Sequence, residues 1–207
     1  MAEIIQIGSV FNCYLVVGRE GSILVDTGSL SARKKILRSA RDCHVNLIVL
    51  THGHFDHIAN AAYLSRELGV PIAMHQADEV LIKNHEARTL STDNFIGKMI
   101  KRMSGRMLAK SPVEIFEPDF YLSQDMSFDK YGVDATVLEL PGHTRGSIGI
   151  LVGGDKLIAG DAMMNMGGSP ASKLFEDKDK MLQSMTSIRK MKCAEVYVGH
   201  GRKMKIK

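Results

Sequence analysis

The sequence predicts a chain of mixed helix and strand (fold class α+β or α/β) in which two β-sheets pack together and helices cover their outer faces. Each half of the chain begins with β-type runs, in residues 3–25 and 121–159, and ends in alternating helix and strand patterns. Since a sheet or an amphipathic helix must bury its apolar face against another layer, two such halves are expected to stack. The composition agrees, because 207 residues with 44% hydrophobic and 24% charged side chains are typical of a globular domain.

The first half is expected to open with a meander of three short strands, since glycines punctuate its β-type runs. Helix and strand then alternate, and the apolar run after Asn46 has the continuity of a buried strand. The expected elements are strands Glu3–Ile7, Asn12–Val17 and Ser22–Val25, a helix Leu30–Arg41, a strand Leu47–Leu50, a helix Asp56–Leu68, a strand Pro71–Met74 and a short helix Asp78–Lys83.

The middle of the chain is expected to be a helical insertion at about 85–112, because no strand pattern occurs there. Over Phe95–Lys110, apolar residues recur at helical spacing with lysines and arginines between them, which is typical of an amphipathic helix with a basic face. Gly97 and Gly105 weaken that helix. We expect its methionine-rich stripe to pack on the core; a lid over a pocket, a dimer contact and a membrane-surface helix are the alternatives.

The second half is expected to form the other sheet, followed by one more helix and strand. Its predicted elements are strands Tyr121–Leu122, Val133–Leu140, Ser147–Val152 and Lys156–Ala159, a helix Asp177–Met191 and a strand Glu195–Val198. Neither an internal repeat nor a low-complexity segment interrupts this pattern. We therefore expect residues 1–207 to form one domain.

Composition and charge exclude several classes of protein. No apolar run reaches the ~18 residues that a membrane span needs, and Met1–Val10 has no basic residue of the kind that opens a secretory signal. The three cysteines, Cys13, Cys43 and Cys193, are too few and too far apart for a disulfide framework. A net charge of +4 and the absence of tryptophan give no support for a nucleic-acid partner. We expect a cytoplasmic protein without membrane contact.

Histidines and aspartates carry the chemical information. In Thr51-His52-Gly53-His54-Phe55-Asp56-His57, four side chains that bind metals lie within six positions, between a predicted strand and a predicted helix. Burying so many ionisable groups together is costly unless they are coordinated or paired. Closely spaced histidine and aspartate residues are a recognised metal-ligand pattern, so this segment predicts a metal site.

Three later residues stand in similar places. His143, Asp161 and His200 each follow a predicted strand directly and each lies next to a glycine. Strand ends are where rigid scaffolds present functional groups, and glycine lets the backbone approach a ligand closely. The other histidines, His44, His75 and His85, have no such setting, and we expect them to be structural or exposed.

The order of these residues resembles the pattern of the metallo-β-lactamase-fold superfamily, and of its glyoxalase II-like small hydrolases. Val25-Asp26-Thr27-Gly28 also resembles the superfamily's early aspartate turn. The resemblance implies a four-layer αββα sandwich of two mixed sheets with a two-metal site at one edge. It implies that His52, His54 and His143 bind the first metal, that Asp56, His57 and His200 bind the second, and that Asp161 bridges both.

Such a site would hydrolyse a small molecule. Imidazole and carboxylate ligands suit zinc, the metal that we expect, and also iron or manganese. Two divalent cations would lower the pKa of a bridging water from near 16 to roughly 7, so that hydroxide attacks an ester, thioester or lactone. Asp56 is the candidate to relay a proton to the leaving group. Asp26, Thr51 and Thr144 are candidates to orient the imidazoles, although turn chemistry explains the two threonines equally well.

Alternatives remain open at this point. A phosphodiesterase or nuclease would use the same two metals, and the resemblance also includes mononuclear iron dioxygenases of persulfides, which would use His52, His143 and Asp161. A non-catalytic metal module is disfavoured, because structural zinc sites are closed by four protein ligands. The chain ends seven residues after His200, so we expect no C-terminal helical domain of the glutathione thioesterases. A homo-oligomer is compatible with the sequence.

Overall fold

Two mixed β-sheets form the centre of the computed structural model, which describes residues 2–8, 10–85, 87–93, 95, 97–99, 101–102, 113–166, 170–191 and 193–205. The first sheet has the order β1-β2-β3-β4-β5-β6 and the second has the order β10-β9-β8-β7. In the first sheet, the neighbouring strands from β1 through β3 pair antiparallel, and the neighbouring strands from β3 through β6 pair parallel. The strands are β1 (Glu3–Ile7), β2 (Cys13–Val17), β3 (Ser22–Val25), β4 (Val45–Val49), β5 (Ile72–Met74), β6 (Phe120–Tyr121), β7 (Ala135–Glu139), β8 (Ile148–Val152), β9 (Lys156–Ile158) and β10 (Glu195–Tyr197).

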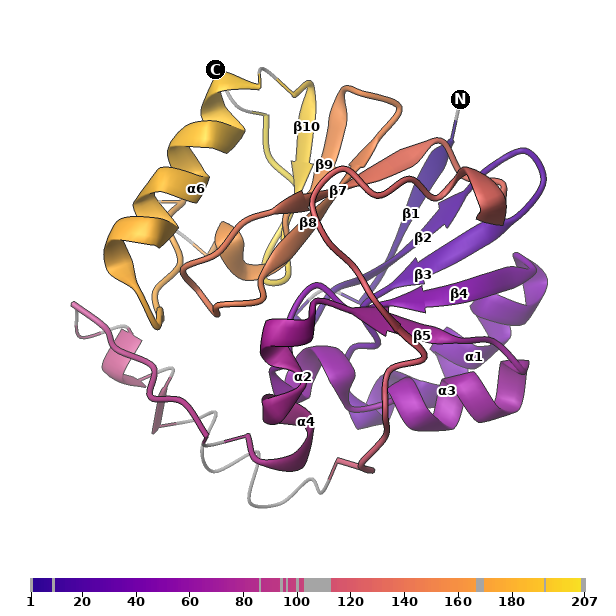
Figure 1. Ribbon diagram of the computed structural model, residues 1–207, viewed down its shortest axis with the longest axis horizontal. Coiled ribbons are helices and arrows are strands. Elements are labelled where there is room, and N and C mark those ends of the chain that lie inside the picture. Colours follow the sequence, from indigo (N-terminus) through magenta and orange to yellow (C-terminus); the bar gives the residue numbers. More distant parts are fainter. Residues whose placement is uncertain are drawn as a thin grey trace.

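Helices cover the outer face of each sheet (Figure 1). α1 (Arg33–Asp42) and α3 (Ala61–Leu68) lie on the first sheet, and α6 (Lys178–Lys190) lies on the second. The short helices connect strands: η1 (Leu30–Ala32), α2 (Phe55–Ile58), η2 (Gln76–Asp78), α4 (Val80–Lys83), η3 (Asp129–Tyr131) and η4 (Gly160–Ala162). The predicted sandwich of two sheets with outer helices is confirmed.

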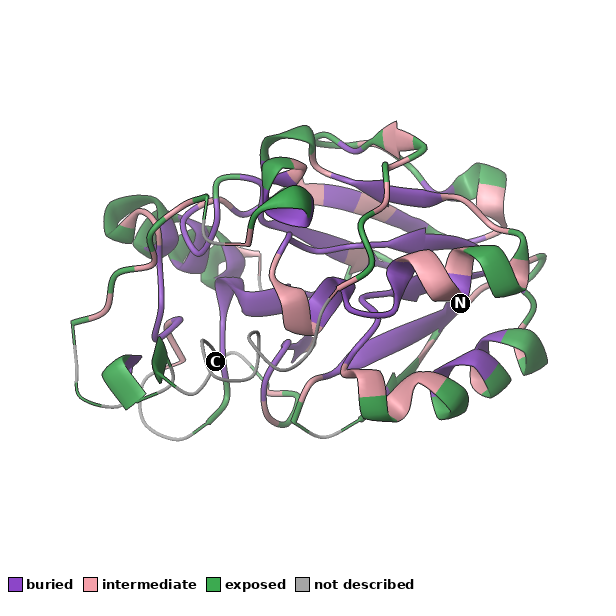
Figure 2. Cartoon of the chain, turned by 90° about the horizontal axis from the view of Figure 1, so that it is seen from below, coloured by how far each residue is buried: buried purple, intermediate pink, exposed green. Residues whose placement is uncertain are grey.

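Three separate groups of buried apolar side chains hold these layers together. The continuous apolar run Leu47–Leu50, in and just after β4, is buried on both faces: Leu47 and Val49 pack between the two sheets, while Ile48 and Leu50 pack under the helices. A strand buried on both faces needs such a continuous run. The third group lies between the second sheet and α6 and includes Ile188. Figure 2 shows buried residues concentrated in the sheets and exposed residues on the outer helices.

One predicted helix is divided in two. The spacing over Asp56–Leu68 predicts one helix, but the structure forms α2 and α3 with a break at Asn60. The Asn60 side chain donates hydrogen bonds to the carbonyls of Thr27 (2.7 Å) and Ser29 (2.9 Å), which turns the chain at this point. Because the apolar periodicity continues across the break, the sequence pattern alone does not show that the helix is interrupted.

The expected packing of the insertion is wrong where it can be followed. Residues 95, 97–99, 101 and 102 are helical, but Phe95 is 74% and Met99 is 50% exposed. Gly97 is buried instead, and a Cβ there would lie 2.6 Å from the carbonyl oxygen of Lys173. Two residues of the predicted apolar stripe are therefore exposed rather than packed on the core. Ile96, Ile100 and residues 103–110, which hold the rest of the predicted stripe, lie outside the described residues.

Within the described part of the chain, every helix is too short or too polar to cross a membrane.

Candidate metal centre

All seven predicted ligands gather at one edge of the two sheets, and each stands where a regular element ends or begins. His52 and His54 occupy the turn between β4 and α2, and Asp56 and His57 lie in α2. The second sheet contributes the other three: His143 follows β7, Asp161 lies in η4 after β9, and His200 follows β10. The predicted convergence of these side chains on one centre is therefore what the structure contains.

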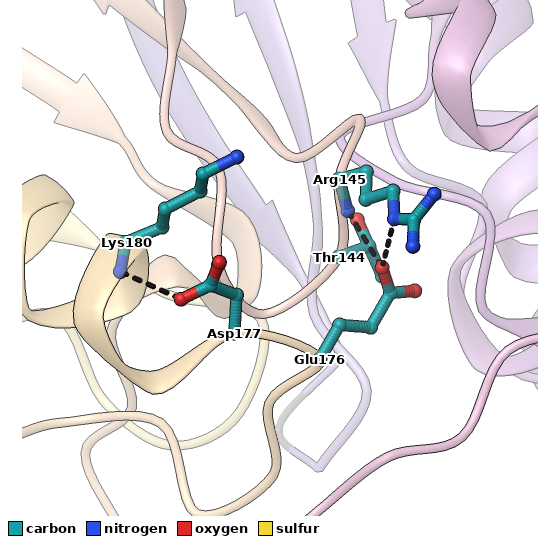
Figure 3. Close-up of a pocket in the computed structure, with 6 residues that line it drawn as sticks. Thr144, Arg145, Glu176, Asp177 and Lys180 are labelled. Carbon is teal, nitrogen blue, oxygen red and sulfur yellow. Dashed lines mark hydrogen bonds and ion pairs between the residues drawn. The ribbon is translucent and has the colours of Figure 1, made fainter.

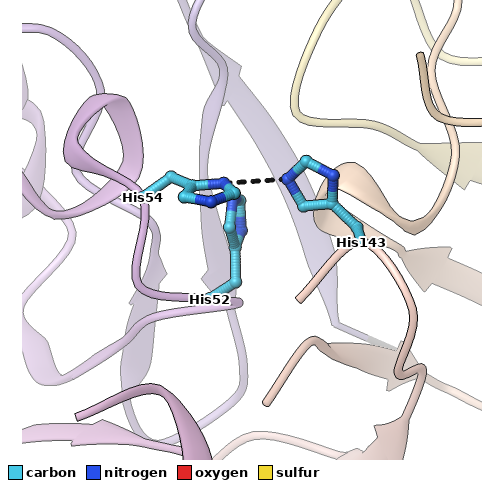
Figure 4. Close-up of side chains that lie close together, drawn as sticks. All are labelled: His52, His54 and His143. Carbon is cyan, nitrogen blue, oxygen red and sulfur yellow. Dashed lines mark hydrogen bonds between the residues drawn. The ribbon is translucent and has the colours of Figure 1, made fainter. Parts of the chain in front are cut away.

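His52, His54 and His143 form the first group. Their ring centroids are 4.7–4.8 Å apart, and Nδ1 of His54 lies 2.9 Å from Nε2 of His143. Figure 4 shows His54 and His143 pointing toward one another from opposite loops above His52. Three nitrogen atoms, one from each ring, lie within 4.8 Å of one another, close enough to hold one cation.

Asp56, His57 and His200 form the second group. Oδ2 of Asp56 lies 3.2 Å from Nε2 of His200 and 3.9 Å from Nε2 of His57. Asp161 connects the two groups, because its carboxylate lies 3.5 Å from His57, 3.2 Å from His200 and 3.5 Å from His143. The two candidate sites thus share one carboxylate.

Four of the five imidazoles are fixed by a hydrogen bond on their outer nitrogen. Nδ1 of His57 lies 2.8 Å from Oδ2 of Asp26, and Nδ1 of His52 lies 3.1 Å from the Thr51 hydroxyl. Nδ1 of His143 donates to the Leu174 carbonyl and Nδ1 of His200 donates to the Val10 carbonyl. When such a ring is neutral, the proton held on Nδ1 leaves Nε2 with its lone pair directed into the centre, as metal-binding histidines require.

Three buried atoms in this centre have no hydrogen-bond partner. They are Nε2 of His52, Nε2 of His57 and Oδ1 of Asp161. A buried polar atom without a partner costs about 1–3 kcal/mol, so such atoms need an explanation. A divalent cation provides one, since imidazole nitrogen and carboxylate oxygen are the donors that zinc, iron and manganese accept. The residues present therefore fit a metal centre.

The pKa values divide the five histidines into two kinds. Burial lowers the pKa of His52 and His143, and it lowers that of His54 to about 3. Burial acts on His57 and His200 as well, but nearby carboxylates outweigh it. Asp26 is the main cause for His57, whose pKa rises to about 9, and Asp161 is the main cause for His200, whose pKa rises well above the usual range.

The aspartates remain ionised for the complementary reason. Burial raises their pKa, but His57 and His200 reverse that effect, so the pKa of Asp56 falls to about 2 and that of Asp161 falls well below the usual range. At neutral pH the centre holds carboxylates facing two cationic rings on the second group, and three neutral rings on the first.

Of the three residues expected to orient the imidazoles, Asp26 and Thr51 contact one and Thr144 bonds elsewhere. Asp26 contacts His57 directly and also accepts hydrogen bonds from the backbone nitrogen and hydroxyl of Thr51 (2.8 Å each). Thr51 contacts His52. Thr144, however, donates to Asp78 (2.6 Å) rather than to an imidazole. Sequence reasoning missed Asp78, and it also missed the carbonyls of Val10 and Leu174, which carry no side-chain signal.

Gly199 shows why glycine flanks a candidate ligand. A Cβ at this position would lie 2.1 Å from Oδ1 of Asp161 and 2.6 Å from Cε1 of His57. Only a residue without a side chain allows the last loop to approach the centre this closely.

A cavity of about 330 Å³ adjoins the His143 loop. Gly142 and Thr144, the neighbours of His143, line it together with charged residues of both signs, Arg145, Lys180, Glu176 and Asp177 (Figure 3). The cavity therefore offers space for a polar small molecule against the loop that carries His143, although none of the seven candidate ligands lines it.

Comparison with known proteins places the chain among relatives of known fold. A model of the Metallo-beta-lactamase superfamily matches residues 10–200. An uncharacterized protein of Mycobacterium tuberculosis is 29% identical over 143 residues, which are 66% of this chain and 58% of that protein. The chain thus spans less than two thirds of the length of this relative.

Two further relatives have names that specify an activity. The hydroxyacylglutathione hydrolase GloC of Haemophilus influenzae is 28% identical over 68% of this chain and 60% of its own length. The acyl-coenzyme A thioesterase MBLAC2 of Bos taurus is 29% identical over 68% of this chain and 53% of its own length.

Solved structures share the fold over nearly the whole chain. The di-iron-bound form of TTHA1623 superposes with a TM-score of 0.74 at 22% identity and covers 99% of this chain and 94% of its own. ETHE1 from Myxococcus xanthus superposes with a TM-score of 0.68 at 17% identity and covers 99% and 80%. At these identities the likeness concerns the fold.

Proposed function

The chain belongs to the metallo-beta-lactamase superfamily, and from this premise we propose that it is a hydrolase that uses two divalent cations to cleave a thioester, ester or lactone. In this proposal His52, His54 and His143 bind one cation, Asp56, His57 and His200 bind the other, and Asp161 lies between them. Zinc is the proposed metal. The observation that carries the proposal is the convergence of the seven side chains, with Nε2 of His52, Nε2 of His57 and Oδ1 of Asp161 buried and without a hydrogen bond.

The bound cations would supply hydroxide at neutral pH, because divalent metals lower the pKa of coordinated water from near 16 to about 7, and they would stabilise negative charge on the reacting oxygen. The chain's own residues set the geometry. Hydrogen bonds to Asp26, Leu174 and Val10 fix the rings of His57, His143 and His200, so little reorganisation is needed when the substrate reacts.

Asp56 is the proposed proton carrier. Its side chain is 14% exposed, whereas that of Asp161 is 4% exposed, so Asp56 is the carboxylate of the centre nearer to solvent. A carboxylate at this boundary can pass a proton to the departing thiolate or alkoxide. Removing the carboxylate charge with Asp56→Asn would slow this transfer.

Thioesters are the substrate class that this proposal favours. The names of two relatives, hydroxyacylglutathione hydrolase and acyl-coenzyme A thioesterase, both specify an acyl group carried on a thiol. The cavity beside His143 is lined by Arg145, Lys180, Glu176 and Asp177, which suits a polar carrier with charged groups. These observations support a small acyl-thiol substrate.

The test combines metal analysis with a panel of thioester, lactone and phosphodiester substrates. Protein purified without added metal is expected to bind two zinc ions per chain and to cleave thioesters. His54→Ala is expected to lose one ion and to lower kcat/KM by at least about 100-fold, because a ligand is removed.

His44→Asn is the matched control, because His44 is exposed, lies outside the centre and has φ +51°, a backbone conformation that asparagine tolerates. It is expected to retain both ions and full turnover. One iron per chain, or cleavage of phosphodiesters alone, would contradict the proposal.

A further inference from the structure

Asp78 is a fully buried carboxylate that joins the two loops carrying the proposed three-histidine site. Its Oδ2 accepts hydrogen bonds from the backbone nitrogen of Gly53 (3.0 Å) and from the hydroxyl of Thr144 (2.6 Å). Its Oδ1 accepts one from the backbone nitrogen of Gly146 (2.8 Å). Gly53 separates His52 from His54, and Thr144 follows His143. One side chain therefore holds both loops at a fixed separation.

Two glycines make this approach possible. A Cβ on Gly146 would lie 2.7 Å from Cγ of Asp78, and a Cβ on Gly53 would lie 2.8 Å from the backbone carbonyl oxygen of Asp78. Such distances do not occur between real atoms, so any side chain at either position would push Asp78 out of its place. The local sequence is thus adapted to a carboxylate between the two loops.

Arg88 balances the charge of Asp78 and extends the connection. It donates from Nη2 to Oδ1 of Asp78 (2.7 Å) and from Nη1 to Oε2 of Glu176 (2.9 Å). The side chains of the three residues are 11%, 0% and 7% exposed, so this is a buried ionic bridge. Removing one member of such a bridge leaves an uncompensated buried charge.

Glu176 leads back to His143 from the other side. Its backbone nitrogen donates to the carbonyls of Gly142 (2.9 Å) and His143 (3.0 Å), and its carboxylate accepts from the backbone nitrogen of Arg145 (Figure 3). Two residues earlier, the Leu174 carbonyl accepts the Nδ1 proton of His143. Arg88 therefore contacts both carboxylates that hold the His143 loop, those of Asp78 and Glu176.

From these contacts we propose that Asp78 and Arg88 are positioning residues that set the separation of the His52–His54 turn and the His143 loop, and with it the affinity of the three-histidine site for its cation. This inference rests on the proposed ligand set. Among the described residues, neither Asp78 nor Arg88 forms a hydrogen bond with Asp56, His57 or His200, so the second site is expected to be independent of the bridge.

The experiment measures the two binding constants separately. Metal-free protein is titrated with Zn²⁺ by calorimetry and with Co²⁺ by visible absorption, and His54→Ala and His200→Ala assign each binding phase to a site. Arg88→Met and Asp78→Asn are expected to weaken the three-histidine site about 10- to 100-fold, to alter its Co²⁺ spectrum, and to change the other constant less than about twofold. Arg88→Met keeps the test valid where Asp78→Asn fails to fold.

Lys178→Ala is the matched control. Lys178 and Asp93 form an exposed ion pair (2.6 Å) between the same two segments that Arg88 and Glu176 join. This variant is expected to leave both constants unchanged. Unchanged constants in Arg88→Met, or equal weakening of both sites, would overturn the inference. A wild-type chain that binds no Zn²⁺ would instead overturn the proposed function.

Discussion

At the scale of single residues, the five clustered histidines differ in charge because they face different neighbours. For His52, His54 and His143, burial outweighs the nearby carboxylates and lowers the pKa. His57 and His200 face carboxylates, which raise theirs. Without metal, the two cationic rings therefore occupy positions where a cation would bind, and a metal ion must displace their protons.

Zinc binding at pH 7.5 is expected to release about one proton each from His57 and His200, and none from the other three imidazoles, which are already neutral. Calorimetry in buffers of different ionisation enthalpy measures this release. The His57→Gln variant is expected to release about one proton fewer than the wild type. Equal release from both proteins would show that His57 is neutral before the metal binds.

At the scale of elements, the break between α2 and α3 decides where two ligands point. The backbone nitrogen and hydroxyl of Thr27 donate to the carbonyl of His57 (2.8 and 2.7 Å), and the Asn60 side chain donates to carbonyls in the same turn. α2 can therefore direct Asp56 and His57 to the centre while α3 packs beside α1 on the sheet.

Asn60→Ala is expected to lower the free energy of unfolding by roughly 1–3 kcal/mol, because buried carbonyls lose their donor, and to weaken the Asp56–His57–His200 site. Urea unfolding and Zn²⁺ titration measure the two effects. Asn165→Ala is the control: its side chain forms an exposed hydrogen bond to the Arg202 carbonyl, and its effect is expected to stay within about 0.5 kcal/mol. Equal losses in both variants would contradict a special role for the break.

At the scale of the whole molecule, the centre lies where the two sheets meet. Asn12 and Tyr14 of the first sheet reach the carbonyl of Val198 at the start of the His200 loop (2.8 and 2.6 Å). The backbone nitrogen of Ile148 in the second sheet donates to the carbonyl of Thr51 (2.8 Å). Charge in the centre therefore affects the stability of the entire fold.

The metal-free protein is expected to be most stable near pH 6.5. His57 has a pKa of about 9 in the folded chain and about 6.5 when unfolded, so its contribution is complete below pH 6.5 and is lost as the pH rises through 9. His54 has a folded pKa of about 3, so its contribution is complete above pH 6.5 and is lost as the pH falls toward 3. Denaturant unfolding with EDTA at pH 5, 6.5 and 9 measures the curve. A steady rise from pH 6.5 to 9 would contradict it.

The sequence predicts those features that repeat or cluster along the chain. The unbroken apolar run Leu47–Leu50 predicts a strand buried on both faces, and the spacing of His52, His54, Asp56 and His57 predicts their convergence. Both patterns are local, so they can be seen without the fold.

Features that depend on distant partners were not predictable. Asp78 belongs to no motif, and its role becomes visible only when Gly53, Thr144 and Gly146 surround it. Helical spacing predicts that Phe95 and Met99 share a face, but it cannot tell which face meets the protein, and both are exposed. The ligand role of the seven side chains stays a prediction that metal titration will test.

Each of the two proposed ligand triads draws two members from the first half of the chain and one from the second, His143 or His200. A nascent polypeptide that has left the ribosome only as far as α4 offers four donors and completes neither triad. With the proposed ligands, neither cation site would be complete until the later sheet has docked on the earlier one. Tight binding of metal at the proposed sites would thus require that both halves of the chain have been made and folded together.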